Sequence, residues 1–252
     1  MSGIFTEEVI WIVGCSAGIG KDLAISLAAS GASIILSARS KDQLELVNKK
    51  LVGSGHLILP LDISNIKEVA KAVKLITTKY QKIDRVIFMA GIYEPTSCNS
   101  MDINKASQII DINLKGVINI VHFTLPILEQ QSKGQIVLCA SIAGYFGLPN
   151  GQPYSASKAG IINLAESLRC EYDKSNIDVK VINPGFVKTR LTDKNKFSMP
   201  FIMDSKEAAL AIIKGIQKKS FEIHFPKKLT IIFKILRILP FAIYFWLVKV
   251  IF

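Results

Sequence analysis

Cysteine and histidine are scarce in this 252-residue sequence, and they do not cluster. The four cysteines stand far apart, with no CxxC pair, and none lies beside one of the three histidines. This distribution argues against a disulfide scaffold and against a zinc site, so we expect no bound metal. The same distribution of cysteines is typical of a protein in a reducing compartment.

The first residues lack the pattern of a secretory signal. Glu7 and Glu8 precede an apolar run of only five residues, 9–13. A signal peptide would instead place basic residues before a longer apolar run. We therefore expect a cytoplasmic protein.

Acidic residues are the minority, with 20 Asp and Glu against 31 Lys and Arg and a formal net charge of +11. They are absent from residues 223–252, which are mostly Ile, Leu, Phe and Val. The basic residues of this tail are Lys227, Lys228, Lys234, Arg237 and Lys249. A segment both basic and this apolar favours a membrane surface or a protein partner, and we expect no nucleic-acid binding.

The tail also lacks a long uninterrupted apolar run. Its charge-free stretch, 238–248, has only eleven residues and contains Pro240. These features disfavour one membrane-spanning helix and predict two short helices, over 227–239 and 241–252. The helices would make a peripheral membrane contact through 227–252, or pack against another subunit of a homo-oligomer, a dimer or tetramer.

Short β-branched runs alternate with longer segments of helical period between about residue 8 and residue 185. The predicted strands are 9–13, 33–37, 56–60, 85–89, 135–140 and 178–183. The predicted helices are 18–30, 41–52, 65–80, 103–131, 155–174 and 204–219. Because the strands show no polar alternation, both faces should be covered, which predicts a doubly wound parallel α/β sheet.

Gly14, Gly18 and Gly20 follow the first predicted strand with the spacing GxxxGxG. Glycines there let the backbone turn sharply and approach a pyrophosphate, which the following helix N-terminus stabilises. A tight strand-to-helix turn needs glycine in any case, so the motif alone does not establish nucleotide binding. Its place on the first strand of a βαβ series strengthens that interpretation.

Tyr154 and Lys158 stand four residues apart at the start of a predicted helix. This spacing puts both side chains on one helical face. An ammonium beside a phenol favours the phenolate, and a tyrosine so tuned can act as a general acid or base. Such a pair is common by chance, and taken alone it favours a structural role.

Five further motifs occur in a fixed order along the chain. They are Asp62 after the third strand, Ala90-Gly91 after the fourth, Asn113 in the long helix, Ser141 thirteen residues before Tyr154, and Pro184–Thr189 after strand 178–183. Together with the glycine turn and the Tyr-Lys pair, they make the sequence resemble the short-chain dehydrogenase/reductase family over roughly residues 6–225. The resemblance implies a Rossmann-type fold for 1–225, with 226–252 as a C-terminal extension. It also implies an oxidoreductase that interconverts a carbonyl and an alcohol.

The resemblance assigns roles residue by residue. Tyr154 would donate a proton to the carbonyl oxygen, and Lys158 would lower the tyrosine's pKa and bind the nicotinamide ribose. Ser141 would stabilise charge on the substrate oxygen, and Asn113 would hold a water of a proton relay. The implied cofactor-binding residues are Gly14, Ser16, Gly18, Ile19, Gly20, Arg39, Ser40, Asp62, Ile63, Ala90, Gly91, Tyr154, Lys158, Pro184, Gly185, Val187 and Thr189.

Two positions depart from the family pattern. Val13 replaces the usual Thr before the first glycine, and Phe88-Met89 stands where the family commonly has Asn-Asn. Since both positions normally support the central strands through hydrogen bonds, we expect altered packing there and intact chemistry.

The end of the second strand predicts which nicotinamide cofactor is used. Ala38 stands where NAD-preferring members carry Asp, and Arg39 follows it. An arginine offers a charge-assisted fork to a 2′-phosphate, which predicts NADP(H) over NAD(H). Ser40 or Ser16 would assist it, although a solvated surface arginine is the alternative.

Segments that line the substrate cleft in the family are apolar and aromatic here. They contain Ile92, Tyr93, Tyr145, Phe146, Leu148, Phe186, Phe197, Met199 and Phe201. This favours an apolar, lipid-like carbonyl or alcohol as substrate, unless these side chains only pack a lid onto the core. The rival hypothesis is a catalytically silent dinucleotide-binding scaffold docked through its tail.

Overall fold

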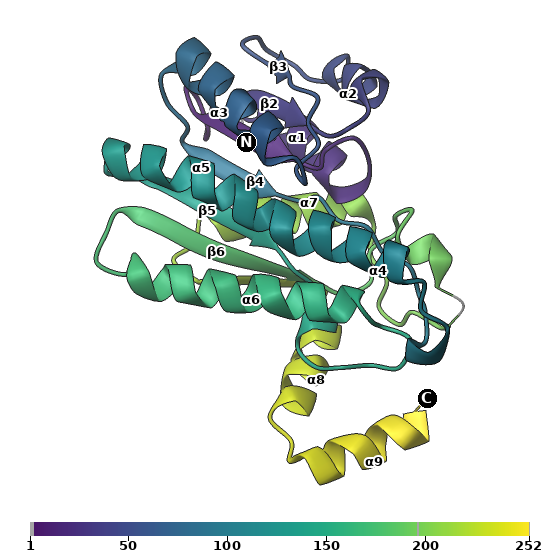
Figure 1. Cartoon of the computed structure of the whole chain (residues 1–252). Helices are drawn as coiled ribbons and strands as arrows, with labels where there is room; N and C mark the ends of the chain where they lie inside the picture. The colour runs from purple at the N-terminus through teal and green to yellow at the C-terminus, as the bar shows by residue number, and fades with distance from the viewer. Residues whose placement is uncertain (1–2, 196, 252) are drawn as a thin grey trace.

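The computed structural model describes residues 3–195 and 197–251, and over these residues the strands form one parallel sheet. The strands are β1 (Val9–Val13), β2 (Ser33–Ser37), β3 (Leu57–Ile58), β4 (Arg85–Phe88), β5 (Gly134–Cys139), β6 (Ile177–Pro184) and β7 (Glu222–Phe225). Their order across the sheet is β3-β2-β1-β4-β5-β6-β7 (Figure 1). The order reverses between β1 and β4, which confirms the doubly wound parallel fold.

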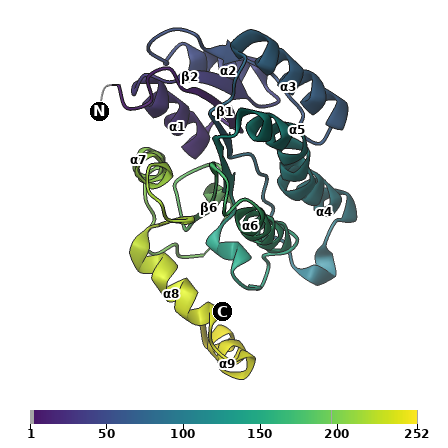
Figure 2. The same ribbon diagram turned by 90° about the vertical axis from the view of Figure 1, so that its left-hand side faces the viewer.

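Helices cover both faces of the sheet, as Figure 2 shows. The helices are α1 (Gly18–Ala28), α2 (Lys41–Asn48), α3 (Ile66–Tyr80), α4 (Ile103–Ile110), α5 (Gly116–Gln131), α6 (Tyr154–Glu171), α7 (Ser205–Ile216), α8 (Lys227–Arg237) and α9 (Phe241–Ile251). Helices α1, α2 and α7 supply the core on one face, and α3, α5 and α6 supply the other.

Strand β1 shows why its sequence, VIWIV, contains no polar residue. All five of its residues are buried, and successive side chains enter opposite cores. Trp11 and Val13 belong to the α3–α5–α6 side, while Ile10 and Ile12 belong to the α1–α7 side, as the two-residue period of a strand requires. Both cores therefore depend on the same short segment.

The structure differs most from the predicted boundaries in the third strand and in the long helix, and several other helices end earlier than predicted. The third strand is only Leu57–Ile58, and the expected helix 103–131 is interrupted by a π-helical turn at Asp111–Lys115. A seventh strand that is not among the six predicted, β7, pairs with β6. Among the described residues of 186–195 and 197–203, Thr192–Lys194 form a 3₁₀ turn, and Val187 and Met203 form an isolated β-bridge.

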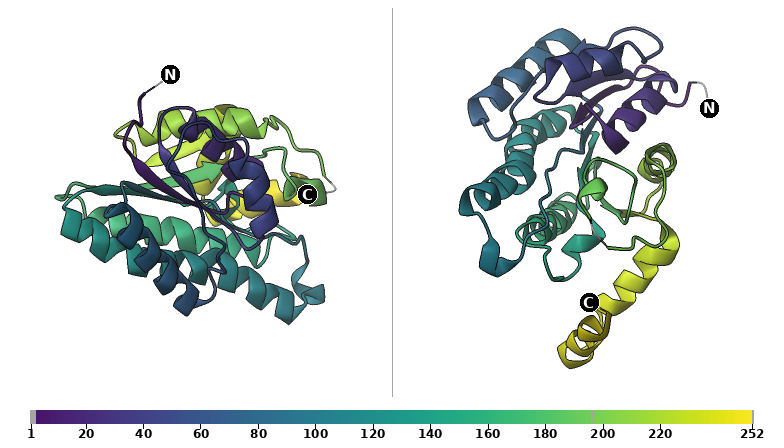
Figure 3. Two further views of the ribbon diagram at one scale, coloured as in Figure 1. Left: turned by 90° about the horizontal axis from the view of Figure 1, so that it is seen from above. Right: turned by 90° about the vertical axis from the view of Figure 1, so that its right-hand side faces the viewer.

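The tail consists of α8 and α9, which meet at Pro240 and project away from the sheet (Figures 1 and 3). Leu229, Thr230 and Tyr244 are its buried side chains among the described residues, and most of its other apolar side chains are exposed. In the described part of the chain, none of the helices has the length and hydropathy to cross a bilayer.

Candidate active site

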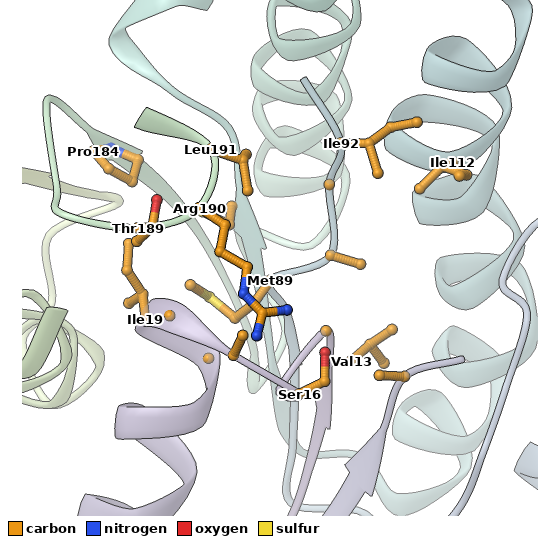
Figure 4. Close-up of a pocket in the computed structure, with 18 of the residues that line it drawn as sticks. Val13, Ser16, Ile19, Met89, Ile92, Ile112, Pro184, Thr189, Arg190 and Leu191 are labelled. Atoms are coloured by element: carbon orange, nitrogen blue, oxygen red, sulfur yellow. The ribbon is translucent and has the colours of Figure 1, made fainter. Parts of the chain in front are cut away.

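A cavity of about 890 Å³ lies at the carboxyl edge of the sheet. Figure 4 shows that its walls come from the turn after β1, the loop after β4, and the segment that follows β6. The site therefore sits at the reversal of strand order, where ligands bind in open α/β sheets. All seventeen residues predicted to bind cofactor line this cavity.

The glycine turn brings the backbone of β1 against that of β4. Gly14 has φ +94°, and a Cβ on it would overlap the amide nitrogen of Ala90. Gly18, with φ +57°, begins α1, so the first backbone N–H groups of that helix face the cavity. Its N-cap, Ala17, has no side-chain oxygen to accept from those groups, and its first turn has no acidic residue.

Uncapped N–H groups at a helix N-terminus attract anions through the helix dipole. This cradle, open to a large cavity, fits the pyrophosphate of a dinucleotide. Around the rest of the cavity, Arg39 and Ser40 follow β2, and Asp62 and Ile63 follow β3. The pyrophosphate cradle and these residues thus line one continuous cavity.

Two of these residues also secure the cavity wall. Asp62 Oδ1 accepts hydrogen bonds from the amide and hydroxyl of Ser64, at 2.9 and 2.7 Å. The carbonyl of Ile63 accepts from Asn119 Nδ2 at 2.9 Å, which fastens the end of β3 to α5.

Ser141, Tyr154 and Lys158 gather at one end of the cavity. Ser141 caps the 3₁₀ turn Ile142–Gly144, because its Oγ accepts from the Ala143 amide at 3.1 Å. Tyr154 begins α6, and Lys158 lies one turn later with its Nζ 5.6 Å from the Tyr154 ring centroid. Lys158 is almost fully buried and donates to the carbonyl of Cys139 at 2.9 Å.

Burial dominates the electrostatics of this group. It raises the pKa of the Tyr154 phenol above its usual range, and the nearby Ser141 hydroxyl offsets only part of that rise. Burial also lowers the pKa of the Lys158 ammonium. Both shifts favour the neutral forms, as desolvation must. The phenol is therefore protonated at neutral pH.

Asn113 lies behind the cavity wall, in the π-helical turn between α4 and α5. Its Oδ1 accepts from the Ile92 amide at 2.8 Å. Its Nδ2 donates to the Ile92 carbonyl at 2.9 Å and to Ser157 Oγ at 3.1 Å. The fully buried amide thus ties the loop after β4 to α6, in addition to any part in a relay. π-Helical turns are frequent at functional sites.

Several lining residues were not found by sequence reasoning. Arg190, Leu191 and Thr192 line the cavity directly after the predicted Pro184–Thr189 motif. In the view of Figure 4 the Arg190 side chain extends from its loop into the cavity. The only signal in the sequence was adjacency to that motif.

The apolar departures from the family pattern occupy the core. Val13 and Phe88 are buried partners in register between β1 and β4, within the core on the α5–α6 side. Met89 packs toward the opposite core and also lines the cavity.

The nine side chains expected along the substrate cleft do not all lie at the cavity. Ile92 lines the cavity, and the Tyr93 ring lies 4.9 Å from that of Tyr154. Phe186 and Phe197 pack on each other, with ring centroids 5.8 Å apart. Tyr145 and Phe146 turn instead toward the C-terminal tail. The structure therefore does not show a cleft lined by all nine of these side chains.

The parallel sheet, the glycine turn and the uncapped helix at its carboxyl edge define a nucleotide-binding α/β protein. The model of the short chain dehydrogenases matches residues 8–199. The chain belongs to the short-chain dehydrogenase/reductase family, whose members are NAD(P)-dependent oxidoreductases acting on small carbonyl or alcohol compounds. Across the described residues, no three His, Cys, Asp or Glu side chains are grouped to hold a metal.

Two relatives agree with this assignment. An uncharacterized oxidoreductase of Myxococcus xanthus is 30% identical over 91% of this chain and 91% of its own length. The 11-beta-hydroxysteroid dehydrogenase-like 2 protein of Arabidopsis thaliana is 33% identical over 93% of this chain and 79% of its own length.

Solved structures share the fold. Levodione reductase superposes with a TM-score of 0.84 at 23% identity, over 90% of this chain and 98% of its own. A short chain dehydrogenase/reductase from Burkholderia phymatum, solved with NAD, superposes with a TM-score of 0.84 at 20% identity, over 91% of this chain and 92% of its own.

Proposed function

We propose that this protein is an NADP(H)-dependent oxidoreductase that interconverts a carbonyl and a secondary alcohol on an apolar substrate. The observation that carries the proposal is the convergence of Ser141, Tyr154 and Lys158 on the wall of the cavity that the glycine turn also lines. Nothing in the packing of the core requires a buried lysine beside a tyrosine and a serine at a cavity wall.

The proposed proton chemistry follows from the protonation states. A nicotinamide bound in the cavity supplies the hydride for carbonyl reduction. Tyr154, protonated because burial raises its pKa, donates its proton to the carbonyl oxygen. Ser141 Oγ stabilises the charge that develops on the same oxygen. Lys158 has its Nζ 5.6 Å from the Tyr154 ring centroid, and in its protonated form it would favour the phenolate left behind.

A Tyr154→Phe variant tests the reaction. We expect it to lose carbonyl reduction, followed by NADPH absorbance over a panel of ketones and aldehydes, by about a hundredfold or more. It should bind NADPH like the wild type in a fluorescence titration. Wild-type protein that binds NADPH yet reduces no carbonyl would favour the rival function, a silent dinucleotide-binding scaffold.

The preference for NADP(H) is supported by two guanidinium groups. Arg39 and Arg190 both line the cavity, from the end of β2 and from the loop after β6. Ala38 adds no carboxylate that would repel a 2′-phosphate. Charge-assisted forks to phosphate are the strongest hydrogen bonds that side chains make.

Cofactor preference is measured by comparing KM for NADPH and NADH. We expect Arg39→Ala to raise KM for NADPH about tenfold or more and to leave KM for NADH nearly unchanged. Lys50→Ala is the control, because Lys50 lines a neighbouring depression and not the main cavity. An NADH preference in the wild type would contradict the proposal.

An apolar substrate is supported by the wall near the catalytic group, where Met89, Ile92, Ile112 and Leu191 line the cavity. Two similar proteins are named for a hydroxysteroid dehydrogenase and for levodione reductase. We expect catalytic efficiency to rise with the apolar surface of the carbonyl compound.

The outward surface of the tail supports a peripheral contact with an anionic membrane. Ile238, Phe241 and Trp246 are 80, 78 and 63% exposed. Basic residues flank these apolar side chains and acidic ones are absent from 227–252. Amphipathic basic helices bind anionic headgroups in this way.

Flotation with phosphatidylserine-containing vesicles tests the contact. Wild-type protein should float with them, and less with phosphatidylcholine alone. A Phe241→Ser/Trp246→Ser variant should stay at the bottom of the gradient. Protein that never floats and sediments as a dimer or tetramer would instead assign this surface to a subunit interface.

A further inference from the structure

Three consecutive residues near the catalytic serine are held by the C-terminal tail. Tyr145, Phe146 and Gly147 lie in the segment that connects Ser141 to Tyr154, and α8 begins only at Lys227. Each of them contacts α8 or α9, directly or through one intermediate side chain.

Tyr145 reaches the tail through a carboxylate. Its hydroxyl donates to Glu222 at the start of β7, and the same carboxylate pairs with Lys234 of α8. Asn183 Nδ2 donates to Glu222 at 2.7 Å. The Arg237 guanidinium, also on α8, lies 5.7 Å from the Tyr145 ring centroid.

These partners keep Glu222 charged. Burial alone would raise the pKa of its carboxyl. The hydrogen bonds from Lys234, Tyr145 and Asn183 outweigh burial and lower the pKa. The carboxylate therefore bridges the tail to the catalytic segment at neutral pH.

Phe146 and Gly147 make the second connection. The Phe146 ring stacks on Phe233 of α8 at 5.3 Å between centroids and contacts Tyr244 of α9 at 5.1 Å. The Tyr244 hydroxyl donates to the Gly147 carbonyl. Tyr244 is only 6% exposed, whereas Trp246, two residues later, is 63% exposed.

The held residues continue directly into the turn that orients the serine. The 3₁₀ turn Ile142–Gly144 carries the amide that binds Ser141 Oγ. It also packs closely on α6, since a Cβ on Gly144 would lie 2.7 Å from the carbonyl carbon of Lys158. A shift of residues 145–147 would thus be transmitted to both Ser141 and the helix that bears Tyr154 and Lys158.

We propose that Phe233, Lys234 and Tyr244 are positioning residues of the active site, which act on Ser141 through residues 145–147. The inference rests on the proposed carbonyl chemistry. It gives the tail a second role in addition to its outward contact with lipid. The inward face of α8 and α9 fixes the catalytic segment, and the outward face remains free to bind the membrane.

Variants of the full-length chain separate the two faces. We expect Phe233→Ala and Tyr244→Ala each to lower kcat for carbonyl reduction about tenfold, because small misplacements of catalytic groups are costly. NADPH affinity should stay within about twofold of wild type, since the cofactor cavity has none of these residues in its wall. Tyr244→Phe, which keeps the ring contact with Phe146, should recover most of the activity.

Trp246→Ala is the matched control on the same helix, and should weaken vesicle binding without changing kcat for a water-soluble carbonyl compound. Hydrogen exchange of the amides of residues 143–147 gives a readout independent of turnover. It should accelerate in Phe233→Ala and Tyr244→Ala and remain at the wild-type rate in Trp246→Ala.

Unchanged exchange and unchanged kcat in both inward variants would overturn the positioning role. Equal losses of kcat in Trp246→Ala and Tyr244→Ala would overturn it as well. A wild-type protein without carbonyl turnover would refute the proposed function, while the exchange measurement would still decide whether the tail holds residues 143–147.

Discussion

The Asn113→Ala variant isolates how the loop after β4 is held beside the catalytic group. It deletes three buried hydrogen bonds, two with the backbone of Ile92 and one with Ser157. At about 1 kcal/mol for each, the free energy of unfolding should fall by about 3 kcal/mol. For a chain of this size that lowers Tm by about 6–12 °C.

The Asn113→Ala substitution should also weaken cofactor binding. Gly91, directly before Ile92, approaches both Lys158 Nζ and Asn113 Oδ1, which lie 3.3 and 3.5 Å from the position of an added Cβ. Loss of the Ile92 anchor should therefore loosen this wall and raise KM for NADPH. Calorimetry and steady-state kinetics on the same preparation measure both consequences.

Asn119→Ala is the matched control. Asn119 is also a buried asparagine of the α4–α5 region, but it makes a single hydrogen bond, to the Ile63 carbonyl at 2.9 Å. Its loss should cost about 1 kcal/mol and lower Tm by about 2–4 °C. If Asn113→Ala lowers Tm no more than Asn119→Ala, the anchoring argument fails.

Two further predictions concern the glycine turn and the bridge to the tail. Gly14→Ala should lower the urea midpoint of unfolding, because its positive φ alone costs about 1–2 kcal/mol and the new Cβ overlaps Ala90. Gly147→Ala, where an added Cβ meets nothing within 4 Å, should unfold like wild type, and equal midpoints for both variants would contradict the assignment. The pKa of Glu222 is lowered in the folded protein from its ordinary value of 4.5, so its contribution to stability is present above that value and lost as pH falls through the folded pKa. The Tm difference between wild type and Glu222→Gln should therefore be largest near pH 6–7 and shrink as the pH falls below 4.5. A difference independent of pH would show that the charge on the pair with Lys234 does not matter.

Strand runs and the motifs beside them could be predicted from the sequence because their causes are local. A buried strand such as β1 needs five consecutive apolar residues, and a turn with φ +94° needs glycine at residue 14. The carboxyl ends of parallel strands share one edge, so residues after each strand had to converge. This explains why the predicted cofactor residues line a single cavity.

Contacts between segments distant in sequence could not be predicted in this way. The π-helical turn that aims Asn113 at Ile92 leaves the apolar period of 103–131 nearly intact. Tyr145 and Glu222 are 77 residues apart, and nothing near either one indicates the pairing. Apolar residues such as Phe146 were expected in the substrate cleft, because composition alone does not distinguish a cleft wall from a docking site for a helix.

The topology of the sheet explains why the tail can serve the active site at all. Every strand of a parallel sheet ends at the same edge, and β7 is followed after one residue by α8. The tail must therefore begin at the edge that holds the cavity. Its first turn packs there, since a Cβ on Gly185 would lie 2.7 Å from Leu229 Cδ2.

That placement links the proposed membrane contact to the proposed substrate. A tail lying on lipid through Phe241 and Trp246 would hold the carboxyl edge of the sheet near the membrane, and with it the catalytic group. An apolar carbonyl dissolved in the bilayer would then have a short path to Tyr154. Making these two side chains polar should consequently reduce turnover of a vesicle-borne ketone, while turnover of a water-soluble one stays unchanged, because the inward contacts of Tyr244 remain in place.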